Sequence, residues 1–93
     1  MVRVVVVYDI SNDNKRFKLA SELKRLGLSR IQRSAFTGML DSSRLRDLYR
    51  ICERYASDSR DIIHTFVLCG YDWSRRRAFG TYERRVVENV VLV

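Results

Sequence analysis

The stretch that decides the fold is VVVVYDISNDNKR, residues 4–16, in which an apolar strand ends on a carboxylate. Four valines and a tyrosine lead to Asp9, a polar turn follows, and a basic helix begins after the turn. The β-branched content of residues 2–9 predicts a strand. A buried strand that ends on an acid raises the question of which charge, metal or substrate that acid meets.

The rest of the chain predicts two helices and three further strands in one domain, residues 1–93. Asn12 and Asp13 offer N-cap chemistry, Gly27 a helix end, and Gly38 a bend or bulge. We expect a helix over 13–27, with a buried stripe of Leu19, Ala20, Leu23 and Leu26, and then two short strands within 29–41 that meet near Phe36 and Thr37. A second helix over 43–56 is capped by Asp41, Ser42 or Ser43, and its buried stripe is Leu45, Leu48, Tyr49, Cys52 and Tyr55 or Ala56. A strand over 61–70, a basic aromatic linker over 70–85 and a C-terminal strand over 86–93 complete the chain.

The order β-α-β-β-α-β is that of the ferredoxin-like fold, an α+β arrangement with an antiparallel sheet and both helices on one face. Strand side chains alternate between the two faces. One face of the first strand carries Val4, Val6 and Tyr8, and the other carries Val5, Val7 and Asp9. Both faces are therefore apolar, although two helices cover only one of them.

A second copy of the chain is the economical cover for the other face, so we expect a twofold homodimer. The hydrophobic C-terminal strand then pairs either within its own sheet or with the partner's edge, since an unpaired apolar edge promotes aggregation. His64 alternates with Ile62, Phe66 and Leu68 in the predicted strand, and we interpret it as a core or interface residue rather than a general base.

The charge balance favours a polyanionic partner. The net charge is +7, with 15 Arg against 3 Lys. Small basic domains commonly bind nucleic acid, and arginine suits bidentate contact with phosphate. An arginine-rich solvated surface, as in thermophiles, is the alternative. No apolar run reaches the roughly 20 residues needed to cross a bilayer, and no signal-like segment precedes the first strand, so we expect a cytoplasmic protein without a membrane partner.

Basic side chains gather in two parts of the sequence. Phosphate contacts from such residues carry no sequence preference, and neighbouring aromatic rings can stack on bases. For the run 75–77, which lies among aromatic residues, a solvated loop is an equal alternative. The candidate nucleic-acid contacts are Arg16, Lys18, Arg30, Arg33, Arg75, Arg76 and Arg77.

A twofold axis would bring two copies of Asp9 together on the face assigned to the dimer. Two carboxylates at close range repel unless a cation or a shared proton lies between them. Hard oxygen ligands suit Mg²⁺ or Mn²⁺, so the pattern predicts one ion per dimer between the paired Asp9 side chains and metal-assisted phosphodiester hydrolysis. The alternative is that Asp9 only caps the following turn or helix.

At the level of motifs, the first half of the chain resembles the small CRISPR-associated endoribonuclease family, the dimeric partner of the CRISPR integrase. The resemblance rests on YDIS-x-DNxR after an apolar strand, on GLxRIQxSxF, and on a helix opened by SSRLRDL. It covers residues 1–50 well and the remainder only in pattern.

The resemblance implies a ferredoxin-like homodimer, with Asp9 of each subunit at a divalent metal, that binds double-stranded DNA or RNA while new spacers are acquired. Tyr8 and Asp9 fall in the strand motif, and Arg16, Arg30 and Phe36 fall at matching positions, so Tyr8 and Phe36 are supporting residues. The sequence departs from the pattern at Lys18, where similar sequences carry arginine, and at Ala35, where a larger aliphatic residue is common.

Three functions follow. The first is a metal-dependent endonuclease that acts on RNA or DNA through the Asp9 pair. The second is a non-catalytic dimeric scaffold that binds duplex DNA and bridges integrase subunits. The third is a toxin-type ribonuclease on the same fold.

Overall fold

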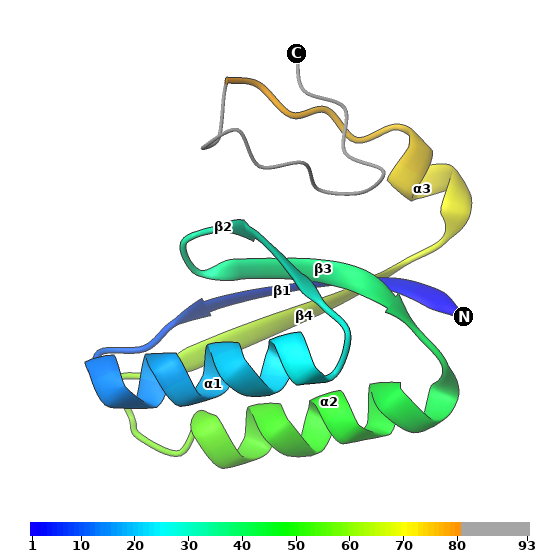
Figure 1. The fold of residues 1–93 in the computed structure, drawn as a ribbon. Coiled ribbons are helices and arrows are strands. Elements are labelled where there is room, and N and C mark those ends of the chain that lie inside the picture. Colours follow the sequence, from blue (N-terminus) through cyan, green and yellow to red (C-terminus); the bar gives the residue numbers. More distant parts are fainter. Residues whose placement is uncertain (81–93) are drawn as a thin grey trace.

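A single antiparallel sheet with two helices packed on one face forms the body of the molecule (Figure 1). The computed structural model describes residues 1–80, and residues 81–93 lie outside the described part. The elements are β1 (Val2–Asp9), α1 (Asp13–Arg25), β2 (Ser29–Gln32), β3 (Ala35–Leu40), α2 (Ser42–Tyr55), β4 (Ile62–Leu68) and α3 (Gly70–Ser74). The sheet has the order β2-β3-β1-β4. The predicted ferredoxin-like α+β fold is confirmed.

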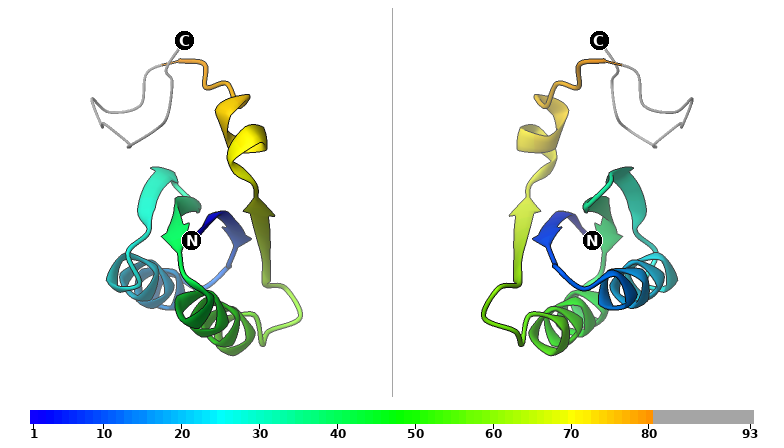
Figure 2. Two further views of the ribbon diagram at one scale, coloured as in Figure 1. Left: turned by 90° about the vertical axis from the view of Figure 1, so that its right-hand side faces the viewer. Right: turned by 90° about the vertical axis from the view of Figure 1, so that its left-hand side faces the viewer.

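The core lies between the sheet and the helices α1 and α2, which run side by side across one face (Figure 2). Strand β1 is central, paired with β3 on one side and β4 on the other. Each fully buried aliphatic side chain contributes about 1.5–3 kcal/mol relative to an exposed one. The fully buried positions include Val4, Val6, Leu19, Leu23, Phe36, Leu40 and Leu48.

Both long helices begin at the caps that the sequence offers. The side chain of Asn12 accepts a hydrogen bond from the backbone of Lys15 at 2.9 Å, and Asp41 accepts one from the backbone of Arg44 at 2.8 Å. At its other end α1 stops at Arg25, and Gly27 follows with φ +106°, a conformation that favours glycine. Gly27 therefore ends the helix as predicted.

The hairpin between β2 and β3 differs from the prediction. The two strands meet at Arg33 and Ser34 rather than near Phe36 and Thr37. Gly38 is not a bulge, because it pairs in register with Val4 of β1. The irregularity lies in β2 instead, where the register shifts between Arg30 and Gln32.

Close packing explains the glycine in β3. A Cβ at Gly38 would lie 2.7 Å from Cδ2 of Leu28 and 3.2 Å from the carbonyl oxygen of Gly27. The turn after α1 therefore rests directly on the backbone of β3. A side chain there would displace Leu28, which is 4% exposed and belongs to the core.

Two further predictions need correction. In α2 the buried residues are Leu48 and Ile51, whereas Tyr49 is 43% exposed, so Ile51 rather than Tyr49 belongs to the buried stripe. The segment 70–85 is not wholly a linker, since Gly70–Ser74 forms the short helix α3. The predicted C-terminal strand, 86–93, lies outside the described residues.

The face of the sheet opposite α1 and α2, which we call the open face, is apolar as predicted. It carries Val5, Val7, Asp9, Ala35, Thr37, Met39, Ile62, His64 and Phe66. Several of its large side chains are about half exposed, among them Phe66 at 50% and Ile62 at 49%. Helix α3 lies on this side of the sheet and contacts β1 near the start of the chain, where the Arg3 guanidinium lies 4.3 Å from the ring centroid of Trp73. Of the helices within residues 1–80, none combines the length and hydropathy of a bilayer-spanning segment.

Candidate functional site

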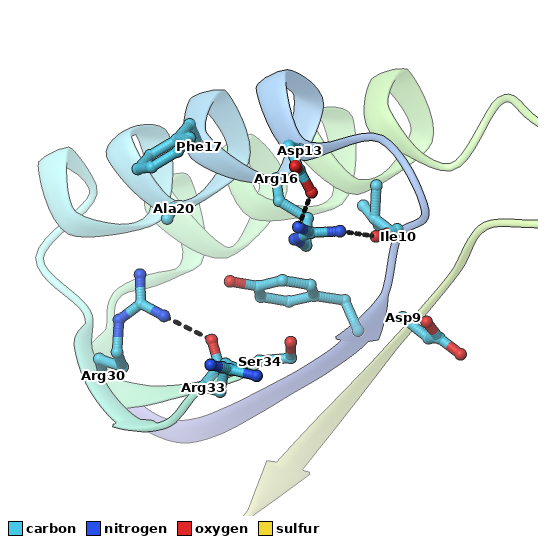
Figure 3. A pocket seen from close by; sticks show the side chains of 10 residues that line it. Asp9, Ile10, Asp13, Arg16, Phe17, Ala20, Arg30, Arg33 and Ser34 are labelled. Atoms are coloured by element: carbon cyan, nitrogen blue, oxygen red, sulfur yellow. Dashed lines mark hydrogen bonds and ion pairs between the residues drawn. The ribbon is translucent and has the colours of Figure 1, made fainter.

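The end of β1 separates two kinds of surface. Tyr8 is 5% exposed and faces the helices, whereas the next residue, Asp9, is exposed and faces the other way. Asp9 pairs with Ile62 of β4 at the margin of the sheet. Its side chain points away from Arg16, Arg30 and Arg33 (Figure 3). The strand end therefore presents a carboxylate on the open face and a phenol on the helix side.

Asp9 does not cap the turn or the helix. The N-cap of α1 is Asn12, and within residues 1–80 no side-chain hydrogen bond or ion pair engages the Asp9 carboxylate. The alternative interpretation of Asp9 as a cap is therefore wrong. An exposed carboxylate of this kind keeps its oxygen atoms available for an external ligand.

A buried carboxylate fixes the turn that follows Asp9. The Asp61 side chain is 1% exposed and pairs with the ammonium of Lys15 at 2.6 Å. It also accepts hydrogen bonds from Ser11, from the backbone N–H at 3.1 Å and from Oγ at 3.3 Å. These donors lower the pKa of Asp61, the Lys15 hydrogen bond most of all. The start of β4 is thereby joined to the turn after β1, which restricts the position of Asp9.

A basic pocket of about 500 Å³ lies on the other side of the strand end, between α1 and the hairpin of β2 and β3 (Figure 3). Three guanidinium groups line it, together with the Tyr8 phenol and the ring of Phe17. The arginines are Arg16 from α1, Arg30 from β2 and Arg33 from the hairpin turn. The structure thus brings together three of the predicted phosphate contacts, which we call the Tyr8 pocket.

Two of these arginines are held in place. Nη1 of Arg16 donates to the carbonyl oxygen of Ile10 at 2.7 Å, and Nη2 pairs with Asp13. Arg30 donates to the carbonyl of Arg33, and its guanidinium lies 4.9 Å from the ring centroid of Phe36. Because each guanidinium has five N–H donors, both keep further donors for a ligand.

Tyr8 remains a neutral donor within this basic pocket. Burial raises the pKa of Tyr8, and the charges of Arg30 and Arg16 oppose that rise without cancelling it. Its ring stacks on Phe36 with centroids 6.3 Å apart. Of the predicted supporting residues, Phe36 therefore contacts both the Arg30 guanidinium and the Tyr8 ring.

The other predicted basic contacts lie elsewhere. Lys18 lines a shallow hollow on the outer side of α1 rather than the Tyr8 pocket. The run 75–77 follows α3 at the opposite end of β1 (Figure 1). There Arg75 donates to the hydroxyl of Tyr71 at 2.9 Å and Arg76 stacks 3.9 Å over the ring of Trp73, whereas Arg77 is exposed. The predicted basic contacts thus lie in three places: the Tyr8 pocket, the outer side of α1 and the segment after α3.

His64 is exposed on the open face, so its interpretation as a core residue is wrong. Its ring stacks on Phe66 with centroids 6.2 Å apart. It pairs with Val7 in the ladder between β1 and β4, two positions from the pair formed by Asp9. Its place on the open face leaves its interpretation as an interface residue a prediction.

Residues 1–80 of one chain do not supply a complete ligand set for a divalent ion. Within residues 1–80 no three His, Cys, Asp or Glu side chains lie close enough to hold a metal together. Mg²⁺ is commonly bound by one or two carboxylates, with waters and phosphate oxygens completing its shell. Asp9 fits that donor set as a single hard ligand, and a second copy on the open face would supply the second.

Comparison with known proteins finds similar sequences and a similar solved structure. The family model described as CRISPR associated protein Cas2 matches residues 1–76. A relative from Aeropyrum pernix, named CRISPR-associated endoribonuclease Cas2, is 39% identical over 80 residues, covering 86% of this chain and 85% of the relative. A Thermoproteus tenax protein named as a fusion of endonucleases Cas1 and Cas2 is 47% identical over 45 residues, which are 48% of this chain and 17% of that one. A solved structure described as that of cas2 superposes with a TM-score of 0.73, covering 92% of this chain and 94% of that chain at 24% identity.

Sequence reasoning found Asp9 and the arginines but missed two residues that shape the site. Asp61 is separated from Lys15 by 46 positions, and no local pattern links them. Phe17 carried a signal that could have been used, since a large apolar side chain on the polar side of a basic helix needs an explanation. It is 75% exposed beside the Tyr8 pocket.

Proposed function

Because the chain belongs to the CRISPR-associated protein Cas2 family, we propose that it is a metal-dependent endonuclease that cuts phosphodiester bonds in nucleic acid during CRISPR spacer acquisition. The observation that carries this proposal is the exposed Asp9 carboxylate at the end of β1. The residue borders a pocket lined by three arginines, and its side chain points away from them. The relatives' names, endoribonuclease and endonuclease, support the reaction class.

The proposed active form is a twofold dimer that buries the open face of both copies. Asp9 lies on that face, so the symmetry axis brings two carboxylates toward one another. One Mg²⁺ or Mn²⁺ per dimer would offset their repulsion. The apolar, half-exposed character of Phe66 and Ile62 supports this arrangement, because such side chains are costly to leave in water.

In this proposal the residues of the chain have separate roles. The two Asp9 carboxylates would hold the ion, which would supply an activated water and offset charge on the phosphate. The Asp61 hydrogen bonds keep Asp9 in position. Guanidinium groups of Arg16, Arg30 and Arg33 neutralise neighbouring phosphates and hold the nucleic acid at the strand end.

A second candidate is a dimeric scaffold that binds duplex nucleic acid and bridges integrase subunits without cutting. The observation in its favour is the relative in which Cas1 and Cas2 are parts of one chain, since fusion partners commonly work together. Within residues 1–80, Asp9 also belongs to no group of three possible metal ligands, which makes a sparse catalytic site. Under both candidates we propose the CRISPR integrase as the partner.

The deciding experiment compares the wild type with Asp9→Ala for Mg²⁺-dependent cleavage of RNA and DNA, and separately for duplex binding. Within residues 1–80 the Asp9 side chain makes no hydrogen bond or ion pair, so the variant should fold normally. Loss of cleavage with binding retained supports the endonuclease. Cleavage that survives the substitution contradicts the assigned site, and binding without any wild-type cleavage, at every metal and pH tested, favours the scaffold.

A further inference from the structure

The open face carries an imidazole close to the Asp9 carboxylate. Among the described strands of this face, only Asp9 and His64 contribute a carboxylate or an imidazole. Asp9 pairs with Ile62 in the ladder between β1 and β4, and Val7 pairs with His64, so Asp9 and His64 are diagonal neighbours. Such neighbours are roughly 7–8 Å apart, within reach of long and aromatic side chains. Both side chains can therefore contact one small ligand.

The His64 ring has no polar partner in the single chain. It is exposed, and within residues 1–80 no hydrogen bond or ion pair engages its nitrogen atoms. The ring stacks on Phe66 with centroids 6.2 Å apart, which limits the directions in which the nitrogen atoms point. The proposed dimer buries this face, and a buried polar group without a partner costs free energy. The dimer therefore requires a partner for His64.

A metal ion satisfies the imidazole and the carboxylate together. Neutral imidazole is the commonest metal ligand in proteins, and it adds a ligand atom without adding to the negative charge of the Asp9 pair. Metal bonds to histidine nitrogen and to carboxylate oxygen are of similar length, about 2.0–2.2 Å for Zn²⁺. Two copies of the chain would supply two carboxylates and two imidazoles, enough for four ligand atoms.

We propose that His64 of each copy is a ligand of the ion held by the paired Asp9 residues. This inference rests on the proposed function and deepens it, because it names the class of ion. A site of carboxylates and waters alone suits Mg²⁺, whereas imidazole nitrogen suits first-row transition metals. The completed site therefore prefers Mn²⁺ and the later divalent ions of that row to Mg²⁺.

The test detects the nitrogen ligand directly and does not depend on cleavage. Mn²⁺ is added to the untagged protein at less than one ion per two chains, and electron spin echo envelope modulation is recorded. His64 is the one histidine in the chain, so modulation by an imidazole nitrogen has a single source. Wild type should show that modulation, and it should retain Mn²⁺ in the presence of excess Mg²⁺.

His64→Phe removes the ligand but keeps a flat ring beside Phe66 and a side chain that suits a strand. The dimer should persist, verified by sedimentation, while the nitrogen modulation disappears and excess Mg²⁺ displaces Mn²⁺. Ile62→Ala is the matched control, because Ile62 is 49% exposed on the same face and has no ligand atom in its side chain. It should keep the modulation.

The inference and the proposed function fail in different ways. Mn²⁺ bound by wild type without nitrogen modulation overturns the inference alone, and so does modulation that survives in His64→Phe. Modulation lost equally in His64→Phe and Ile62→Ala overturns it as well. If wild type binds no Mn²⁺, the proposed metal site fails, and this inference fails with it.

Discussion

The proposed dimer predicts a large effect of one substitution on the open face, Phe66→Thr. Phe66 is 50% exposed in the single chain. A phenylalanine buries about 150–250 Å² in all, so on the order of 100 Å² is left to bury in the dimer. At about 25 cal/mol per Å² this is roughly 2.5 kcal/mol per copy, and a twofold interface contains two copies.

Threonine keeps the β-branched character that suits a strand while it removes most of the apolar area. We therefore expect the dimer to lose about 3–5 kcal/mol, which raises its dissociation constant by roughly 100- to several thousandfold. Sedimentation equilibrium over a range of concentrations measures this constant. Circular dichroism of the variant verifies that the protomer still folds.

Val67→Thr is the matched control, since Val67 is 46% exposed and pairs with Val4, so it lies toward the helix side of the same strand. It should leave the dissociation constant nearly unchanged. The reasoning is refuted if Phe66→Thr and Val67→Thr weaken the dimer equally. A monomeric wild type at micromolar concentration would refute it as well.

Three further predictions address the fold and the site. Gly38→Ala should destabilise the protein by about 1–3 kcal/mol in urea unfolding, because its Cβ would lie 2.7 Å from a methyl group of Leu28, whereas Gly70→Ala, which meets nothing within 4 Å, should not. The lowered pKa of Asp61 means that its contribution to stability is present above its unfolded value of about 3.9 and is lost as the pH falls through the lower, folded value. The melting temperature of Asp61→Asn should therefore depend less on acid pH than that of the wild type; identical profiles would count against the buried interaction. Arg33→Gln should weaken duplex binding and reduce the slope of log affinity against log salt by about 1, and an unchanged slope would remove Arg33 from the phosphate contacts.

The pattern in β1 determined most of the architecture, and it could be predicted from the sequence. Alternation in a strand is a local property, so Val4 and Val6 on one face and Val7 and Asp9 on the other follow directly from spacing. The conclusion that two helices cover only one apolar face needed only the order of the elements.

Local signals were weaker where the predictions failed. The hairpin turn at Arg33 and Ser34 contains no glycine, proline or asparagine, so its position could not be located. Helix α3 has only five residues, too few to show a helical period. Gly38 correctly indicated a special position in the strand, but the reason is the close approach of Leu28 rather than a bulge.

Alternation in β1 placed Tyr8 and Asp9 on opposite faces, but the pocket that collects arginines from separate elements could not be predicted. Arg16 and Arg30 come from separate elements, and only the folded chain places both beside Tyr8. The same holds for Asp61, whose partners Ser11 and Lys15 lie 50 and 46 positions earlier in the sequence. Long-range ion pairs of this kind leave no trace in spacing or periodicity.

The central claim is that two copies of Asp9 share one divalent ion, and a metal titration tests it most directly. Mn²⁺ binding to the purified protein, followed by electron paramagnetic resonance, should saturate at one ion per two chains. Asp9→Asn, which keeps the shape of the side chain and removes its charge, should abolish that binding. One ion per chain, or saturation unchanged in Asp9→Asn, would contradict the account.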